Sequence, residues 1–187
     1  MPRQGLDAQQ VVARAAQIAD ADGLAQVTLA RVAAELGVRA PSLYNHVAGR
    51  PALLRALAIR SLAELTAELR EAAVGRSGAD ALRAIAHAYR AYAHRHPGRY
   101  AATLGAPAAD DQQYAAAAQH AVGVLLAVLA GWGLEGEQAL HRVRVLRAAL
   151  HGFVTLEAEG GFGLPLDLDT SFDLLLQTVI AGLATAG

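Results

Sequence analysis

Apolar residues recur every three or four positions through most of this chain, which is the spacing of amphipathic α-helices. The first such stretch runs from Asp7 to Asp22 and begins with the Asp-x-x-Gln spacing of a capping box, while Gly23 suits a helix C-terminus. Two short helices are expected over residues 28–36 and 40–47. Residues that favour β-strands are few, so we expect an all-α protein.

Longer helices are expected further along the chain. Gly49 interrupts the pattern, and Pro51 stands where the first turn of a long fourth helix can accept it. A Gly-containing break follows at 75–78, and the Gly- and Pro-rich stretch 160–169 reads as a loop. The pattern therefore predicts three short helices followed by a bundle of about six longer ones, about nine in total. The segments expected after the break are 79–96, 97–104, 111–131, 135–158 and 170–184.

Composition excludes several classes of protein. Of the 187 residues, 54% are hydrophobic and 18% are charged, which predicts a folded chain. The absence of cysteine excludes disulfides, thiol catalysis and thiolate metal sites, and no His pair has metal-site spacing, so we expect no metal and no cofactor. The longest apolar stretch, 121–134, is shorter than a membrane span, and the N-terminus has no signal core. We expect a soluble cytoplasmic protein without membrane attachment.

Charge is distributed unevenly along the chain. Residues 1–60 carry seven arginines and four acidic residues, while the chain as a whole has a net charge of −1. A basic N-terminal third is the distribution expected of a head that binds a polyanion.

The segment 28–54 has the spacing of a helix-turn-helix, in which two short helices meet through Gly37 and the second enters the major groove of DNA. Leu43 and Val47 share one face of the second helix and can anchor it to a core. Its other faces carry Ser42 and Asn45, which can reach base edges, and also Tyr44 and His46, while Ala40 and Pro41 offer apolar contacts. The start of the fourth helix, at Arg50, favours phosphate.

These residues resemble the TetR family of bacterial transcriptional regulators over roughly residues 7–60. The matching positions are Thr28, Ala33, Leu36, Gly37, Val38, Ser42, Leu43, Tyr44, His46, Val47, Arg50, Leu53 and Leu54. The resemblance implies phosphate contacts by Tyr44, Arg50 and Thr28, and base contacts by Ser42, Asn45 and residues near Arg39. Some members read a base with an arginine where this chain has Ala30, so that contact is either absent or made by Arg31. The predicted DNA-contacting residues are Thr28, Arg31, Arg39, Ala40, Pro41, Ser42, Tyr44, Asn45, His46 and Arg50.

The resemblance also predicts a helix-turn-helix domain over residues 1–48 and an effector-binding and dimerisation domain over 49–187, with the fourth helix joining them. A subgroup of the family carries a Trp-His-Gly step in its penultimate helix, where this chain has Leu150-His151-Gly152. The function implied is transcriptional regulation, most simply repression, by a homodimer on a palindromic operator that a small molecule releases.

The C-terminal helices supply polar and aromatic tips among many alanines and leucines, which predicts a mostly apolar cavity for a small, largely apolar effector. If Arg147 faces inward, its charge favours a carboxylate-bearing effector, and if it faces outward a neutral one. The predicted ligand-binding residues are Tyr89, Tyr92, His96, Tyr100, His120, Arg147 and His151.

Dimerisation is expected through the last two long helices, whose final member carries a wide apolar stripe. The predicted interface residues are Leu150, Phe172, Leu175, Leu176, Val179, Ile180 and Leu183.

No nucleophile and base are paired at motif spacing, so we expect that the protein is not an enzyme. The rival functional classes are a small helical enzyme and a ligand-carrying bundle.

Overall fold

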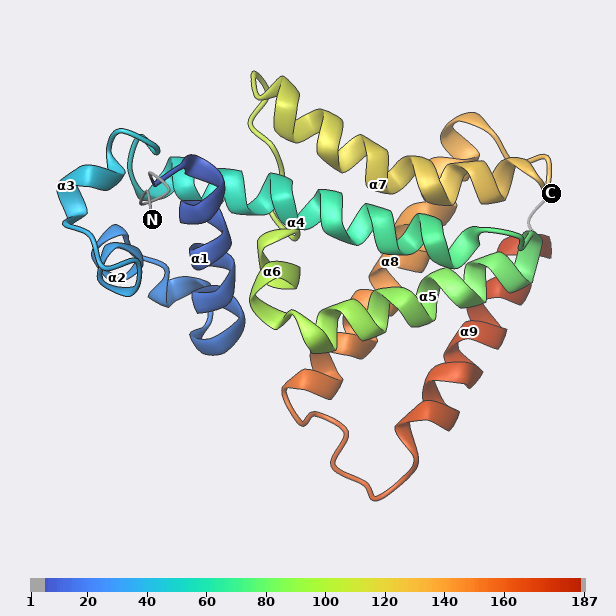
Figure 1. The fold of residues 1–187 in the computed structure, drawn as a ribbon. Coiled ribbons are helices and arrows are strands. Elements are labelled where there is room, and N and C mark those ends of the chain that lie inside the picture. The colour runs from blue at the N-terminus through green and yellow to red at the C-terminus, as the bar shows by residue number, and fades with distance from the viewer. Residues whose placement is uncertain (1–5, 186–187) are drawn as a thin grey trace. The chain divides into compact units, whose positions relative to one another are not determined.

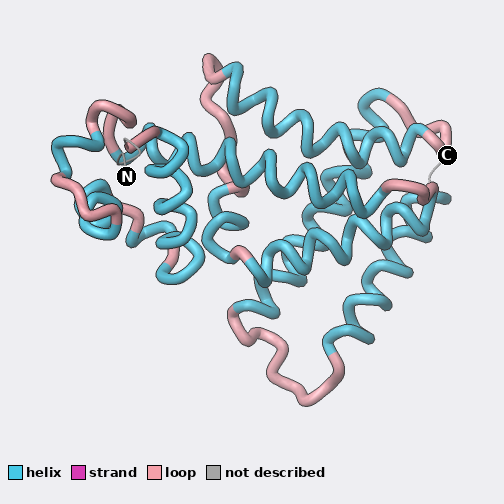
Figure 2. Tube along the Cα trace, in the orientation of Figure 1, coloured by secondary structure: helices cyan, strands magenta, loops and turns pink. Residues whose placement is uncertain are grey.

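The computed structural model describes residues 6–185, within which the chain forms nine α-helices and one 3₁₀ helix and no β-strand (Figures 1 and 2). The all-α prediction is confirmed. The elements are α1 (Ala8–Asp22), η1 (Leu24–Gln26), α2 (Leu29–Glu35), α3 (Ala40–Leu43), α4 (Arg50–Ala73), α5 (Gly78–Arg95), α6 (Pro97–Ala102), α7 (Gln112–Ala130), α8 (Gly136–Ala158) and α9 (Leu168–Thr185).

Local side chains fix the first helix boundaries. The Asp7 carboxylate accepts a hydrogen bond from the backbone N–H of Gln10 at 2.7 Å, and the Gln10 side chain accepts one from Asp7 N–H, which completes the capping box. Thr28 caps α2 in the same manner, by accepting from the N–H of Arg31. The sequence did not predict η1, which fills the link between α1 and α2.

Two compact units make up the chain. The N-terminal unit comprises residues up to 64 together with 95–118, and the C-terminal unit comprises 65–94 and the residues from 119 onward. Helices α4 and α7 each contribute residues to both units. The predicted functional boundary near residue 48 is a different division, based on role rather than compactness, and stays a prediction.

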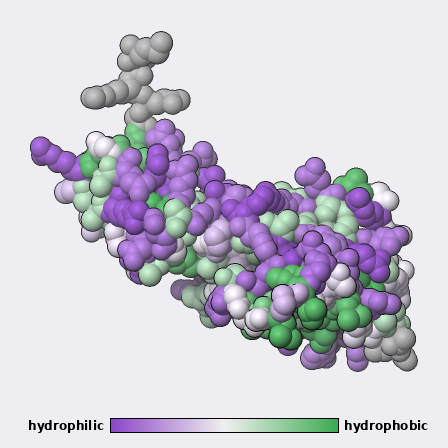
Figure 3. Space-filling model, turned by 90° about the horizontal axis from the view of Figure 1, so that it is seen from below, coloured by the Kyte–Doolittle hydropathy of each residue, from purple (hydrophilic) through white to green (hydrophobic). Residues whose placement is uncertain are grey.

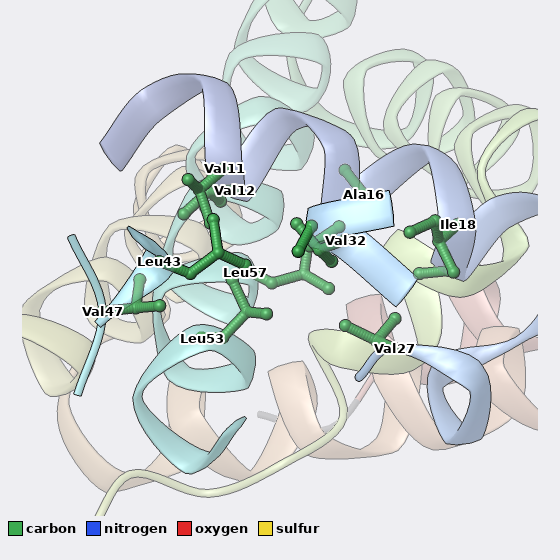
Figure 4. Close-up of a cluster of buried hydrophobic side chains, with 13 residues drawn as sticks. Val11, Val12, Ala16, Ile18, Val27, Val32, Leu43, Val47, Leu53 and Leu57 are labelled. Atoms are coloured by element: carbon green, nitrogen blue, oxygen red, sulfur yellow. The ribbon is translucent and has the colours of Figure 1, made fainter. Parts of the chain in front are cut away.

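The core of the N-terminal unit lies where α1, α2, α3 and the start of α4 meet (Figure 4). Its fully buried side chains include Val11, Val32, Leu43 and Leu53. These residues come from four separate segments, so burying them together holds the short helices α2 and α3, which are too short to be stable alone.

Helix α6 approaches α1 very closely in the same unit. A Cβ atom at Gly98 would lie 2.0 Å from the backbone carbonyl of Ala19, so only glycine fits there. One residue along, the backbone N–H of Arg99 donates to the Asp20 carboxylate at 2.8 Å, and the Arg99 guanidinium lies 2.9 Å from the same carboxylate. Asp20 thereby joins the end of α1 to the start of α6.

An ion-pair cluster joins α5, α8 and α9 in the C-terminal unit. Arg90 donates two hydrogen bonds to Glu157, at 2.5 and 2.9 Å, and a third to Asp169 at 2.7 Å, while His94 lies 2.7 Å from Glu157. The Arg90 guanidinium also lies 4.8 Å from the ring centroid of Phe172. Hydrogen bonding to Arg90, with a smaller contribution from His94, lowers the pKa of the Glu157 carboxyl.

Candidate nucleic-acid interface

The turn between α2 and α3 is fixed by backbone hydrogen bonds. Gly37 adopts φ +68°, the N–H of Val38 donates to Ala33 at 3.0 Å, and the N–H of Gly37 donates to Ala34 at 3.1 Å. This is the Schellman arrangement that ends a helix with a left-handed glycine. It sets the angle at which the chain leaves α2, and therefore the direction of α3.

Helix α3 is shorter than the predicted helix over 40–47. The α-helix ends at Leu43, and residues 44–46 form a turn in which the Leu43 carbonyl accepts hydrogen bonds from both His46 and Val47, each at 2.9 Å. This shared acceptor keeps Val47 buried beside the fully buried Leu43. The α3 segment, defined here as residues 40–47, is thus anchored at two points.

The rest of the α3 segment faces outward. Ser42 and Asn45 are exposed, and Tyr44 is 63% exposed, although Tyr is usually found at least partly buried. Pro41 is exposed as well, while Ala40 and His46 are partly buried. An anchored short helix that presents hydroxyl and amide groups to solvent can form hydrogen bonds with base edges and phosphates.

Arg31 is tied to acidic residues of its own unit. Its guanidinium lies 2.6 Å from Asp22 and donates to Glu35 at 3.2 Å, and Glu35 also pairs with Arg14 at 3.7 Å. A DNA contact by Arg31 therefore requires it to exchange a carboxylate for a phosphate or a base. Its role on DNA stays a prediction.

Arg50 is engaged in a similar way at the start of α4. Its Nε donates to the carbonyl oxygen of Val27 at 2.8 Å, and its Nη2 donates to that of Leu24 at 3.2 Å. The side chain thus holds the end of η1 against α4, a role that the sequence did not reveal because these carbonyls lie more than 20 residues away. Arg39, by contrast, is exposed, and its guanidinium has no hydrogen bond or ion pair with any described residue.

The predicted effector residues are divided between the two compact units, and their role in binding stays a prediction. Tyr89 and Tyr92 are buried in the C-terminal unit, whereas Tyr100 is buried in the N-terminal unit. His96 also belongs to the N-terminal unit and lies 3.4 Å from Asp20, and Arg147 is exposed on α8.

The C-terminal unit has a cavity of about 700 Å³ between the end of α4 and α7. Of the predicted ligand-binding residues, His120 lines this cavity, and His151 instead lies 3.4 Å from the hydroxyl of Thr155. The other lining residues include Arg70, Arg76, Gln119 and Trp132, which the prediction left out.

Most of the predicted dimer residues face inward. The side chains of Leu150, Phe172, Leu176, Ile180 and Leu183 are at most 5% exposed within their own protomer. Phe172 of the α9 stripe packs on His87 and Arg90 of α5 and on Phe153 of α8. Of the predicted interface residues, only Leu175 and Val179 keep partial exposure. A dimer through α8 and α9 has to use their outer faces.

Two predicted absences concern metals and membranes. Residues 6–185 contain no group of three or more His, Cys, Asp or Glu side chains placed to hold a metal ion. The expectation that no segment reaches the length of a membrane span needs correction, because α7 is 19 residues long with a mean hydropathy of 1.4. Uncharged residues before position 121 extend the apolar stretch, and an apolar helix of a soluble protein has the same length and composition.

Comparison with known proteins identifies the family. The model of the tetracyclin repressor-like C-terminal domain matches residues 82–179. The chain is 38% identical to the HTH-type transcriptional regulator Rv0681 of Mycobacterium tuberculosis over 95% of this chain and 82% of that protein. It is 35% identical to the HTH-type transcriptional regulator YobS of Bacillus subtilis, over 97% and 95% of the two chains.

A solved structure shares the fold of this chain. The Streptomyces coelicolor TetR family protein ActR, in complex with (S)-DNPA, has the same fold, with a TM-score of 0.69 and 22% identity over 97% of this chain and 98% of ActR. The relatives are transcriptional regulators and not enzymes. This chain belongs to the TetR family of DNA-binding transcriptional regulators.

Proposed function

We propose that this regulator is a repressor that binds a palindromic operator as a homodimer and leaves it when a small molecule binds. The observation that carries the proposal is the α3 segment, which combines two buried anchors, Leu43 and Val47, with the exposed side chains Ser42, Tyr44 and Asn45. A lone monomer would read too few base pairs, whereas a dimer places two α3 segments in successive major grooves about 34 Å apart.

Different residues supply affinity and specificity in this proposal. Ser42, Asn45 and residues near Arg39 contact base edges, while Tyr44 contacts a phosphate. Thr28 contributes by holding α2, and Arg31 contributes after exchanging its carboxylate partners. Residues 1–48 form the DNA-binding domain, and the remainder binds the effector and the partner subunit in the cytoplasm.

Replacing Asn45 with alanine should weaken binding to the cognate operator by about 1–3 kcal/mol and leave binding to random DNA unchanged, because the amide reads a base. The operator is first selected from fragments of the host genome, and affinity is then measured by fluorescence anisotropy at several salt concentrations. Gln112→Ala, which removes an exposed side-chain amide at the start of α7, is the control and should match the wild type. Equal losses on cognate and random DNA would refute the base contact.

The same titrations separate the two roles of Arg50. If its guanidinium leaves Val27 and Leu24 for a phosphate, Arg50→Ala lowers the slope of log affinity against log salt by about one. If it stays on these carbonyls, Arg50→Ala weakens all DNA binding with an unchanged slope, since the fold around η1 loosens.

The dimer surface that we propose lies on the outer faces of α8 and α9. Exposed apolar side chains there are Val145 (55% exposed), Leu156 (47%) and Leu174 (62%). Gly152 and Gly182 lie on the same helices, and a Cβ at either glycine would meet no atom within 4 Å, so a second chain can approach closely. Figure 3 shows hydrophobic residues gathered into a patch on the face that it presents. Exposed apolar area of this kind marks an interface.

Replacing Leu174 with glutamate should convert the dimer into a monomer, because two carboxylates would be buried in an interface of about 2,000 Å². Light scattering coupled to gel filtration at micromolar concentration measures the mass. Leu104→Glu is the matched control, since Leu104 is an exposed leucine (39%) of the N-terminal unit and should leave the dimer intact. A wild-type monomer under these conditions would contradict the proposed assembly.

Support for an effector comes from the cavity of the C-terminal unit and from the fold shared with ActR, which was crystallised with (S)-DNPA. A ligand that prefers one conformation of the C-terminal domain shifts the population away from the DNA-binding geometry.

A further inference from the structure

The cavity of the C-terminal unit has a composition that specifies a chemical class of ligand. Its volume of about 700 Å³ is in the range of sites for small molecules. The α4–α7 groove, as we name it, is lined by Arg70, Ala73, Val74, Arg76, Ser77, Gly78, Gln119, His120, Gly123, Val124, Ala127, Val128, Gly131 and Trp132. These residues include two arginines and a histidine and no aspartate or glutamate.

Small residues make room in the groove. Gly123 and Ala127 lie four residues apart on one face of α7, and Gly131 follows directly after the end of that helix. A Cβ atom at Gly123 would meet no atom within 4 Å, so open space lies directly above the backbone at that point. An apolar body can therefore lie against α7 without displacing a side chain.

One wall of the groove is aromatic and held in place. The indole nitrogen of Trp132 would lie 2.8 Å from a Cβ at Gly78, and Gly78 adopts φ +53°, so the ring packs directly on the backbone of the α4–α5 turn. A ring fixed in this way offers a preformed surface for an aromatic or apolar ligand, which costs less entropy than ordering a mobile one.

The cations of the groove stand at the end of α4. Arg76 donates to the carbonyl oxygen of Ala72 at 2.9 Å and is thereby held at the helix C-terminus. Arg70 is exposed, and its guanidinium has no hydrogen bond or ion pair with any described residue. Two guanidinium groups without a neighbouring carboxylate in the groove lining favour an anionic group on the ligand.

We infer that the α4–α7 groove binds an amphipathic carboxylate, whose apolar or aromatic body lies on Trp132 and the small face of α7 and whose carboxylate pairs with Arg70. This inference names the effector class of the proposed function, and the effect of that ligand on DNA binding rests on the proposed function. Helix α4 runs without a break from Arg50 to Ala73, so a ligand held by Arg70 acts on the same helix that follows the α3 segment. The outward-facing Arg147, which the sequence suggested for this role, lies outside the groove lining.

The test uses nitrophenylbutanoate and its primary amide as a matched pair of probes on the full-length protein. Binding is measured by calorimetry and by quenching of Trp132, which is the single tryptophan of the chain. We expect saturable quenching by the carboxylate, with at least tenfold weaker binding of the amide, because only the acid pairs with Arg70. Equal affinity for acid and amide would overturn the inference.

Variants locate the site. Arg70→Glu should weaken the carboxylate at least tenfold and leave the amide unchanged, and Gly123→Leu should weaken both probes by filling the groove. Arg147→Glu makes the same charge change outside the groove and should bind like the wild type. Circular dichroism verifies that each variant is folded. Wild-type affinity in both Arg70→Glu and Gly123→Leu would refute the groove as the binding site.

Operator binding is measured separately by anisotropy, so the two proposals fail in different ways. If the groove does not bind the carboxylate, the wild type and Arg70→Glu should bind the operator equally well in the presence of that probe. Failure of the proposed function shows as absent operator binding, even where the probe still quenches Trp132.

Discussion

Replacing Glu157 with glutamine should lower the free energy of unfolding by about 2 kcal/mol at pH 7, because removing one partner of a largely shielded ion pair leaves the charge of Arg90 only partly compensated. The Arg90 and Glu157 side chains are 13% and 9% exposed, and two hydrogen bonds join them as a bidentate pair. Asp169, which is 81% exposed, compensates only part of the lost partner. Urea unfolding followed by circular dichroism measures the change.

The same variant should change the pH dependence of stability. Hydrogen bonding to Arg90 lowers the pKa of Glu157 in the folded state, so the unfolded carboxyl takes up its proton first. The stability contributed by the ionised pair is therefore present above the unfolded pKa, about 4.5, and is lost as the pH falls through the lower folded value. Glu157→Gln should lack this decline in acid.

Glu159→Gln is the matched control, since Glu159 is exposed near the end of the same helix. We expect it to change stability by less than about 0.5 kcal/mol. Similar losses in both variants would mean that the pair with Arg90 does not stabilise the fold. The double replacement Arg90→Met with Glu157→Leu should recover much of the loss, because apolar residues of similar size can replace a buried pair.

Replacing Gly98 with alanine should cost about 3 kcal/mol, because the added methyl group would meet the backbone of Ala19 at 2.0 Å. Backbone atoms of a packed helix cannot rotate away as a side chain can, so α6 must shift from α1. That shift also strains the hydrogen bond from Arg99 N–H to Asp20. Thermal and urea unfolding of the full chain measure the loss.

Gly123→Ala adds the same methyl group but should have the opposite effect on stability. Its added methyl group meets no atom within 4 Å, and alanine has the higher helix propensity, so stability should rise by about 0.5–1 kcal/mol. If Gly98→Ala were equally stabilising, the close approach of α6 to α1 would be refuted.

Signals that act within a few residues predicted the helix ends in this chain. The capping pair Asp7 and Gln10, the cap Thr28 and the left-handed Gly37 all act on backbone groups no more than four positions away. The end of α3 was predicted too far along, because Leu43 accepts two hydrogen bonds in a turn that periodicity cannot distinguish from a helix. For the same reason the link η1 went unpredicted.

Contacts between distant segments were less accessible to sequence reasoning. The apolar stripe of α9 predicted burial correctly but not whether the cover comes from the same chain or from a partner, since both produce the same periodicity. The groove is formed by residues near 70–78 and 119–132, whose meeting depends on tertiary packing. A usable signal was the four-residue spacing of Gly123, Ala127 and Gly131, which places only small residues on one face of α7 and just after its end.

The pairing of Arg31 and Arg50 with oxygens of their own unit bears on how the protein searches a genome. Both arginines flank the α3 segment, yet Asp22, Glu35 and the η1 carbonyls already hold them. Random DNA attracts proteins through unpaired cations, and a genome offers about a million or more such competing sites. On the proposed function, cations that stay occupied until the operator is reached weaken binding to random DNA, so less of the protein is held on the wrong sequences.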